Sequence, residues 1–238
     1  MHNLGNTRSS HHFNHLLHTP DTFVRAPLPG MRKATAIIHA APALGAAFTQ
    51  YTAEFEAGGS LGPASTQRFV YVLSGKLKAL GITLGPDEYA YLPVGGEPVV
   101  ASTKTRASII EKPHESIGAV PPAAFVGNEK DIAPIPLMGD PWAEVRTLIP
   151  AADRSFDFAV NTMTFQPGGS LPMVEAHVME HGLQMLSGGG IYRLGDHWYP
   201  VSAGDFIWMG PYCPQWFGAI GKTPAKYLIY KDWNRHPL

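Results

Sequence analysis

Two stretches of the sequence decide the fold, FTQYTAEFEAGGSL at residues 48–61 and FAVNTMTFQPGGSL at residues 158–171, which lie 110 positions apart. Each is followed by the tripeptide Leu-Ser-Gly, at residues 73–75 and 186–188, where the offset is 113 positions. The later copy therefore carries three extra residues between its two blocks. A repeat this long indicates a duplicated domain, because solenoid units recur at periods of about 20–50 residues.

Both copies show the pattern of short strands separated by turns. Apolar residues alternate over residues 51–55 and cluster over residues 69–73, and glycine-rich turns follow at residues 58–59, 85–87 and 188–190. Period-two alternation indicates half-buried strands. Since no long amphipathic helix is present, the sequence predicts an all-β chain with an antiparallel sandwich or barrel in each half.

The repeat and the proline content predict the domain boundaries. Residues 1–30 are predicted to form an N-terminal arm, residues 31–120 the first domain and residues 142–238 the second. The stretch 121–141 is rich in proline and is predicted to connect the two domains.

Composition excludes several classes of protein. The formal net charge is −1 and no basic run is longer than two residues, which argues against nucleic acid or an anionic membrane as a partner. The single cysteine, Cys213, excludes a disulfide framework and a thiolate zinc site. The longest apolar stretch, residues 36–48, is too short to span a bilayer, and the first residues do not resemble a signal peptide. We therefore expect a soluble, cytoplasmic protein.

A short window in the second half holds three side chains that can donate a lone pair to a divalent metal. Glu175, His177 and His181 lie between Gly169 and Gly188. Carboxylate and imidazole are common metal ligands, and residues two or four apart on a strand share a face. The window therefore predicts a metal site inside the second barrel.

These residues also resemble a known family. The spacing from Gly169 to Gly188 resembles the first cupin motif, and the segments 204–209 and 212–215 resemble the second. Compared with common cupins, Glu175 takes the place of a histidine, His181 the place of the glutamate, and Gln215 the place of the last histidine. This permuted set, in a chain with two cupin repeats, is similar to the (S)-ureidoglycine aminohydrolase family, as is the closing segment 227–235.

The resemblance implies two tandem cupin domains, each a double-stranded β-helix or jelly roll, of which only the second binds metal. It implies a metal set of Glu175, His177, His181 and Gln215. Nitrogen and oxygen donors without thiolate suit one Mn(II) per chain, with iron, nickel or zinc as substitutes. The implied reaction is hydrolysis of (S)-ureidoglycine to (S)-ureidoglycolate and ammonia in purine catabolism.

Further roles follow by position within the family pattern. Glu175 and Gln215 are expected to contact both metal and substrate, while Tyr227 and Lys231 bind the substrate from the other side and Tyr192 lines the pocket. The metal is expected to anchor a small anionic substrate as a template and Lewis acid. Lys231 and Tyr227 are hypothesised to move protons between water and the departing ammonia, with Glu175 as a third catalytic group.

Three alternatives remain open on the sequence alone. The residues 177–181 also spell the H-x-x-E-H pattern of inverted zinc peptidases, which requires a helix. A cupin dioxygenase or isomerase acting on a small carboxylated substrate would use the same ligand types with iron, copper or nickel. A non-catalytic binding protein would hold a ligand without turnover.

The first half is expected to lack a metal. Repeat alignment sets Ser65, Gln67 and Arg68 in place of the three ligands of the window. That half is expected to serve packing, pocket closure or the assembly of a homo-oligomer. The histidines near the N-terminus lack regular spacing and are interpreted as arm or subunit-contact residues: His2, His11, His12, His15 and His18.

Overall fold

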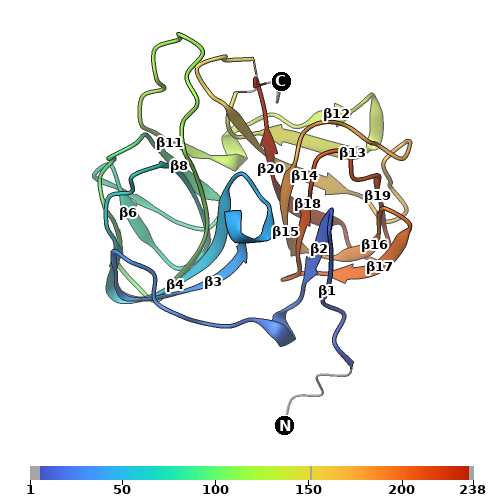
Figure 1. The fold of residues 1–238 in the computed structure, drawn as a ribbon, viewed down its shortest axis with the longest axis horizontal. Coiled ribbons are helices and arrows are strands. Elements are labelled where there is room, and N and C mark those ends of the chain that lie inside the picture. The colour runs from blue at the N-terminus through green and yellow to red at the C-terminus, as the bar shows by residue number, and fades with distance from the viewer. Residues whose placement is uncertain (1–5, 151, 236–238) are drawn as a thin grey trace. The chain divides into compact units, whose positions relative to one another are not determined.

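The computed structural model describes residues 6–150 and 152–235, so His2 and both extreme ends of the chain lie outside it. Antiparallel strands form nearly all of its regular structure (Figure 1). Short 3-10 helices interrupt them at Pro20–Thr22 (η2), Pro42–Leu44 (η3) and Glu129–Asp131 (η4). None of the helices in the described ranges is long and apolar enough to cross a membrane.

The chain divides into two compact units. Val24–Ile132 and Arg154–Asp157 form one, which we call the first barrel, and the remaining described residues form the other, the second barrel. The strands of the first barrel are β3 (Met31–Ala40), β4 (Thr49–Leu61), β5 (Gln67–Ser74), β6 (Leu77–Ala79), β7 (Ile82–Leu84), β8 (Glu88–Leu92), β9 (Val99–Ala101), β10 (Thr105–Lys112) and β11 (Phe125–Asn128). They form one sheet in the order β11-β8-β5-β10-β4-β9-β6-β7, with β3 also paired to β4.

The second barrel contains two sheets. The larger runs in the order β1-β2-β18-β15-β20-β14-β13-β12, and the smaller in the order β17-β16-β19. Their strands are β1 (Ser10–His12), β2 (His15–His18), β12 (Ile135–Leu137), β13 (Asp140–Thr147), β14 (Phe158–Phe165), β15 (His181–Ser187), β16 (Gly189–Leu194), β17 (His197–Ser202), β18 (Phe206–Met209), β19 (Gln215–Ala219) and β20 (Ala225–Asp232).

The duplicated sequence blocks occupy equivalent places in the two units. Strand β4 pairs with β10 and β10 with β5, as β14 pairs with β20 and β20 with β15. The repeated Leu-Ser-Gly ends β5 and β15, and its glycines Gly75 and Gly188 both have positive φ, at 82° and 64°. A Cβ on Gly75 would lie 2.2 Å from the Lys104 carbonyl oxygen, and one on Gly188 would lie 2.5 Å from that of Pro224. Only glycine fits both the left-handed backbone and this close approach.

Each unit has its own apolar core. Inward-facing side chains of β4, β5 and β10, such as Phe55, Val70 and Ile109, form one cluster. Those of β14, β15 and β20, such as Phe165 and Leu183, contribute to the other. The prediction of an all-β chain with two duplicated antiparallel units is confirmed.

Part of the segment expected to be an arm belongs to the sheet of the second barrel. Strands β1 and β2 form a hairpin whose second strand pairs with β18 (Figure 1). The Arg8 guanidinium also binds the buried carboxylate of Asp205, with an N–O distance of 2.6 Å. This hairpin is therefore an edge of a sheet rather than a free extension.

The proline-rich stretch 121–141 also contains strands. It contains β11, which pairs with β8 in the first barrel, and then β12, which pairs with β13 in the second. Both are edge strands, the places where a sheet tolerates proline because one side of the backbone needs no partner. The stretch joins the two halves along the chain and also extends a sheet in each.

Candidate metal centre

Glu175 and Gln215 are brought together by a single antiparallel bridge. The backbone N–H of each donates to the carbonyl of the other, at 2.9 and 2.8 Å. Gln215 is the first residue of β19, and His181 is the first residue of β15. Glu175 forms only this isolated bridge and His177 lies in a loop, so the side chains converge without the continuous strand expected from the sequence.

Polar atoms of all four predicted ligands meet around the His177 ring. Its Nε2 lies 3.2 Å from His181 Nε2, 3.0 Å from the Gln215 side-chain nitrogen and 4.0 Å from a Glu175 carboxylate oxygen. Nδ1 of His177 is buried and has no hydrogen-bond partner in the described part of the chain. Two facing imidazole nitrogens beside a carboxylate are the arrangement that a shared divalent cation satisfies, so this donor set fits a metal.

The second imidazole is held in a ligating form. His181 Nδ1 lies 3.2 Å from the Tyr230 carbonyl oxygen. A carbonyl only accepts, so Nδ1 carries the proton and Nε2 presents its lone pair toward His177. Burial, with smaller contributions from Lys231 and His177, holds the pKa of His181 well below its usual 6.5. The ring is therefore neutral at physiological pH, as a metal ligand must be.

Gln215 is oriented by Tyr192. The Tyr192 hydroxyl donates to Oε1 of Gln215 at 3.3 Å, which leaves the amide nitrogen facing His177. Only the oxygen of an amide can bind a metal, so ligation requires the amide to turn and exchange these two atoms. Burial raises the pKa of Tyr192 far above 10, so its hydroxyl stays protonated and available as a donor.

Strand β20 contributes much of one side of the cavity. On β20 and just beyond it, Tyr227, Ile229, Lys231 and Trp233 all line a cavity of about 240 Å³ that also contains the four polar residues. Alternate residues of a strand share a face, which explains why these four odd-numbered positions point the same way. Tyr227 and Lys231 are predicted from the sequence; Ile229 and Trp233 are further lining residues that the same alternation indicates.

Lys231 lies across the sheet from His181. It pairs across the strands with His181, so its side chain reaches the cavity beside the candidate ligands. Burial lowers the pKa of the Lys231 ammonium below its usual 10.5, although the Glu175 carboxylate opposes the shift. A lower pKa makes the neutral amine, which can accept a proton, more accessible.

Tyr227 is placed as a donor rather than a base. Its hydroxyl is fully buried and donates to the sulfur of Met163 at 3.2 Å. Burial raises its pKa well above 10, with smaller contributions from Tyr192 and Glu175. The phenol therefore stays protonated at neutral pH.

The remaining lining of the cavity is apolar and was not found from the sequence. It consists of Leu137, Met138, Met163, Leu171 and Met179. These residues come from the proline-rich stretch, β14 and loops, where no spacing distinguishes a cavity-lining residue from a core residue. An apolar wall around a small polar group excludes water and strengthens electrostatic interactions inside the cavity.

The inverted zinc peptidase alternative is wrong. Residues 171–180 form bends and a bridge, and β15 begins at His181, so no helix carries the H-x-x-E-H pattern. Glu180, which would be the base in that mechanism, is buried and accepts a hydrogen bond from the Trp208 ring nitrogen at 3.2 Å.

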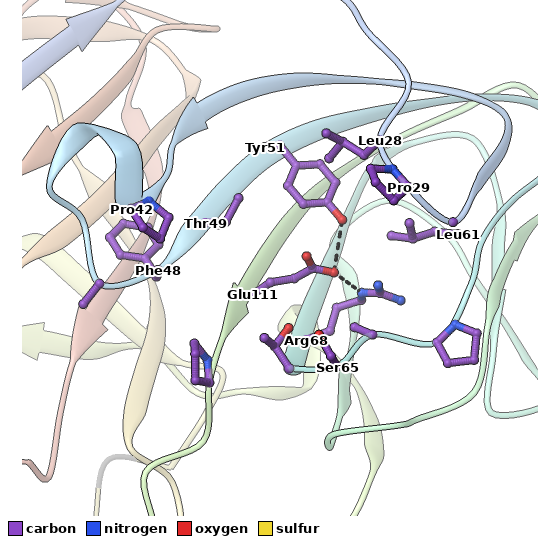
Figure 2. A pocket seen from close by; sticks show the side chains of 16 residues that line it. Leu28, Pro29, Pro42, Phe48, Thr49, Tyr51, Leu61, Ser65, Arg68 and Glu111 are labelled. Atoms are coloured by element: carbon purple, nitrogen blue, oxygen red, sulfur yellow. Dashed lines mark hydrogen bonds and ion pairs between the residues drawn. The ribbon is translucent and has the colours of Figure 1, made fainter.

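The equivalent place in the first barrel holds an ion pair (Figure 2). Arg68 occupies the position of His181 in the repeat. Its cross-strand neighbour is Glu111, whereas that of His181 is Lys231. Arg68 Nε binds the Glu111 carboxylate at 2.6 Å, and the Tyr51 hydroxyl donates to the same oxygen at 3.2 Å.

The side chains of this ion pair line a separate cavity of about 600 Å³ together with Tyr51 and Ser65. Gln67 instead donates to Asp157.

Comparisons with known proteins bear on this arrangement. A cupin-domain family model matches residues 161–230. A rice protein named as a probable (S)-ureidoglycine aminohydrolase is 40% identical over 98% of this chain and 78% of its own length. The (S)-ureidoglycine aminohydrolase of Arabidopsis thaliana is 38% identical over 98% of this chain and 80% of its own length. The chain belongs to the (S)-ureidoglycine aminohydrolase family. The family predicted from the permuted ligand set is therefore confirmed.

The fold of this family member has solved counterparts. The crystal structure of protein Ylba from E. coli superimposes with a TM-score of 0.85, at 30% identity, over 98% of this chain and 97% of that one. The cupin assignment and the family membership agree with the strands and duplicated sheets described above. The prediction of two tandem cupin domains is confirmed.

Proposed function

We infer that this chain hydrolyses (S)-ureidoglycine to (S)-ureidoglycolate and ammonia. The observation that carries this conclusion is the convergence of Glu175, His177, His181 and Gln215 in one cavity with Lys231, in a chain of the (S)-ureidoglycine aminohydrolase family. A cavity of about 240 Å³ suits a substrate of only a few heavy atoms. One ammonium and one carboxylate inside it favour a small substrate that is itself charged.

The proposal includes one Mn(II) per chain, held by the four converging residues. The donors are two imidazoles, one carboxylate and one amide oxygen, a set that suits manganese, with iron, nickel or zinc as substitutes. A cation there would supply Lewis-acid polarisation and a template for the substrate carboxylate. In the first barrel, Arg68 and Gln67 stand at two of the ligand positions. Each side chain already binds a carboxylate, which supports the absence of a metal there.

The side chains of the second barrel divide the remaining tasks. Gln215 and Glu175 orient the substrate from the side of the ligand cluster, while Tyr192 lines the cavity beside Gln215. Tyr227 donates a hydrogen bond to the substrate from the opposite side of the cavity. Lys231 moves protons: its amine accepts one from the attacking water, and its ammonium gives one to the departing amine. The apolar side chains around them exclude bulk water from this exchange.

The deciding experiment is ammonia release from freshly made (S)-ureidoglycine. Protein stripped with a chelator should be inactive, and manganese should restore release together with an excess of the (S) enantiomer of ureidoglycolate, because a site with fixed walls exposes one face of the reacting carbon. Spontaneous decay of the substrate gives no such excess. Oxygen consumption with no ammonia would instead indicate a cupin dioxygenase, and tight binding without turnover would indicate a binding protein.

Assembly and location complete the proposal. We expect a homo-oligomer, which gel filtration with light scattering would detect. The buried thiol of Cys213, without a partner cysteine anywhere in the sequence, is compatible with the reducing cytoplasm.

A further inference from the structure

Three histidines meet at the surface of the second barrel, away from the cavity described above. His12 on β1, His15 on β2 and His197 on β17 each offer a ring nitrogen, and these three atoms lie within 4.8 Å of one another. His12 and His15 face each other across the hairpin, with stacked rings 4.5 Å apart. The His197 ring lies 4.2 Å from that of His12 and 5.6 Å from that of His15.

The surroundings prepare the innermost ring for ligation. His15 is 1% exposed, and its Nδ1 lies 2.9 Å from the side-chain oxygen of Asn14. An amide oxygen only accepts, so Nδ1 carries the proton and Nε2 presents its lone pair. That lone pair accepts a hydrogen bond from the Tyr199 hydroxyl at 3.0 Å, and the same hydroxyl has a second acceptor in Ser10 Oγ at 3.4 Å. Tyr199 can therefore give up Nε2 without losing a partner.

The other two rings can adjust. His12 is half-buried and His197 is exposed. Tetrahedral ligation with Zn–N bonds of about 2.0–2.1 Å places ligand nitrogens about 3.4 Å apart, so the three atoms need to close by little more than 1 Å. Side-chain rotations of two partly exposed residues on a strand edge supply a movement of that size.

We propose that His12, His15 and His197 form a second metal site that takes a zinc-type divalent cation. Three imidazoles without a carboxylate favour zinc, nickel or copper, whereas manganese prefers sites that include oxygen donors, such as the carboxylate and amide oxygen proposed for the barrel. The exposed side of His197 leaves room for a water as the fourth ligand. This site is independent of the proposed hydrolysis.

The site would join two sheets. His12 and His15 belong to the N-terminal hairpin at the edge of the larger sheet, whereas His197 belongs to the smaller sheet β17-β16-β19. A cation shared by them ties the hairpin to residues 182 positions or more away in the sequence. The hairpin is also held by the pairing of β2 with β18, by Leu17 in the apolar core and by the nearby Arg8–Asp205 ion pair.

The test compares zinc binding by the full-length, manganese-loaded protein and three single variants. His197→Ala and His12→Ala remove a ligand from positions where truncation leaves no buried cavity, and His11→Ala is the matched control. His11 lies on the same strand, is exposed, and is not part of the cluster. After equilibration with zinc and desalting, the metal content per chain is measured, with competition by a chromogenic chelator for affinity.

We expect His197→Ala and His12→Ala to retain one zinc fewer per chain than the wild type and His11→Ala. Their affinity for that zinc should fall at least about 100-fold, since loss of even an outer-shell partner lowers metal affinity about 10–100-fold. Any zinc that exchanges into the barrel does so equally in all four proteins and cancels. Cobalt(II) should give intense tetrahedral absorption bands in the wild type and His11→Ala but not in His197→Ala. Equal zinc content and affinity in all four proteins would overturn the proposal.

Discussion

Replacing Lys231 with methionine should lower kcat for ammonia release by about 100- to 10,000-fold while leaving the manganese content unchanged. A positioned general acid–base group contributes about this much to an enzymatic rate. Methionine matches the length and apolar stem of lysine, so the buried wall of the cavity stays filled. Lys231 is also outside the four-residue ligand set, and metal content separates loss of proton transfer from loss of the site.

Lys226→Met is the matched control for this variant. Lys226 lies on the same strand, β20, five residues earlier, and is not part of the cavity lining. An odd offset along a strand places a side chain on the opposite face. The control should therefore keep the wild-type kcat. A kcat in Lys231→Met close to that of the control would remove Lys231 from the proton-transfer step.

Asp157→Asn should lower the free energy of unfolding by about 3–5 kcal/mol. Asp157 is fully buried and binds Lys112, which is 1% exposed, at 2.8 Å. The carboxylate also accepts from the Glu115 backbone N–H at 2.8 Å and from the Gln67 amide at 2.6 Å. Neutralising one member of a buried pair leaves the other charge uncompensated, which is the costly case. Denaturant unfolding measures the loss.

Two controls separate burial from charge. Glu115→Gln removes the other ion-pair partner of Lys112, but Glu115 is 61% exposed, so a change of about 0–1 kcal/mol is expected. The double variant Asp157→Asn with Lys112→Met removes both charges and should recover much of the stability. If Asp157→Asn lowered the free energy of unfolding no more than Glu115→Gln does, the buried Asp157–Lys112 pair would stabilise the fold no more than an exposed ion pair.

The same carboxylate gives the first barrel a defined acid sensitivity. Burial by itself raises the pKa of Asp157, but the hydrogen bonds from Lys112, Glu115 and Gln67 outweigh it and hold the pKa below 3.8. A carboxyl group whose pKa is lower in the folded than in the unfolded state stabilises the fold at pH values above its unfolded-state pKa. That stabilisation is lost as the pH falls through the folded-state pKa. Wild-type stability should therefore decline below about pH 4, and Asp157→Asn should lack this part of the decline.

The convergence of the four predicted ligands could be expected from the sequence because three of them are close in sequence. Glu175, His177 and His181 fall within seven residues, and Gln215 was implied by the resemblance to the second cupin motif. The local conformation differed from the expected strand, yet the side chains still converge because the bridge between Glu175 and Gln215 fixes the loop from its other side. Spacing predicted which residues meet better than it predicted the backbone that carries them.

The parts that sequence could not predict depend on distant pairing. His197 is separated from His12 by 185 residues, and only the pairing of β2 with β18 and the fold of the smaller sheet bring them together. Strand β12 was concealed by the proline within it, and β11 by the prolines that precede it in the same stretch; proline is unfavourable within a sheet but tolerated at its edge. Irregular spacing of the N-terminal histidines therefore carried no information about their neighbours.

Anomalous diffraction at the manganese absorption edge, from crystals of the manganese-loaded protein, would show whether the four side chains hold the cation. We expect one strong peak per chain in the second barrel, within bonding distance of the side chains of Glu175, His177, His181 and Gln215. A peak elsewhere in the chain, or these four side chains turned toward bulk solvent with no peak between them, would contradict it.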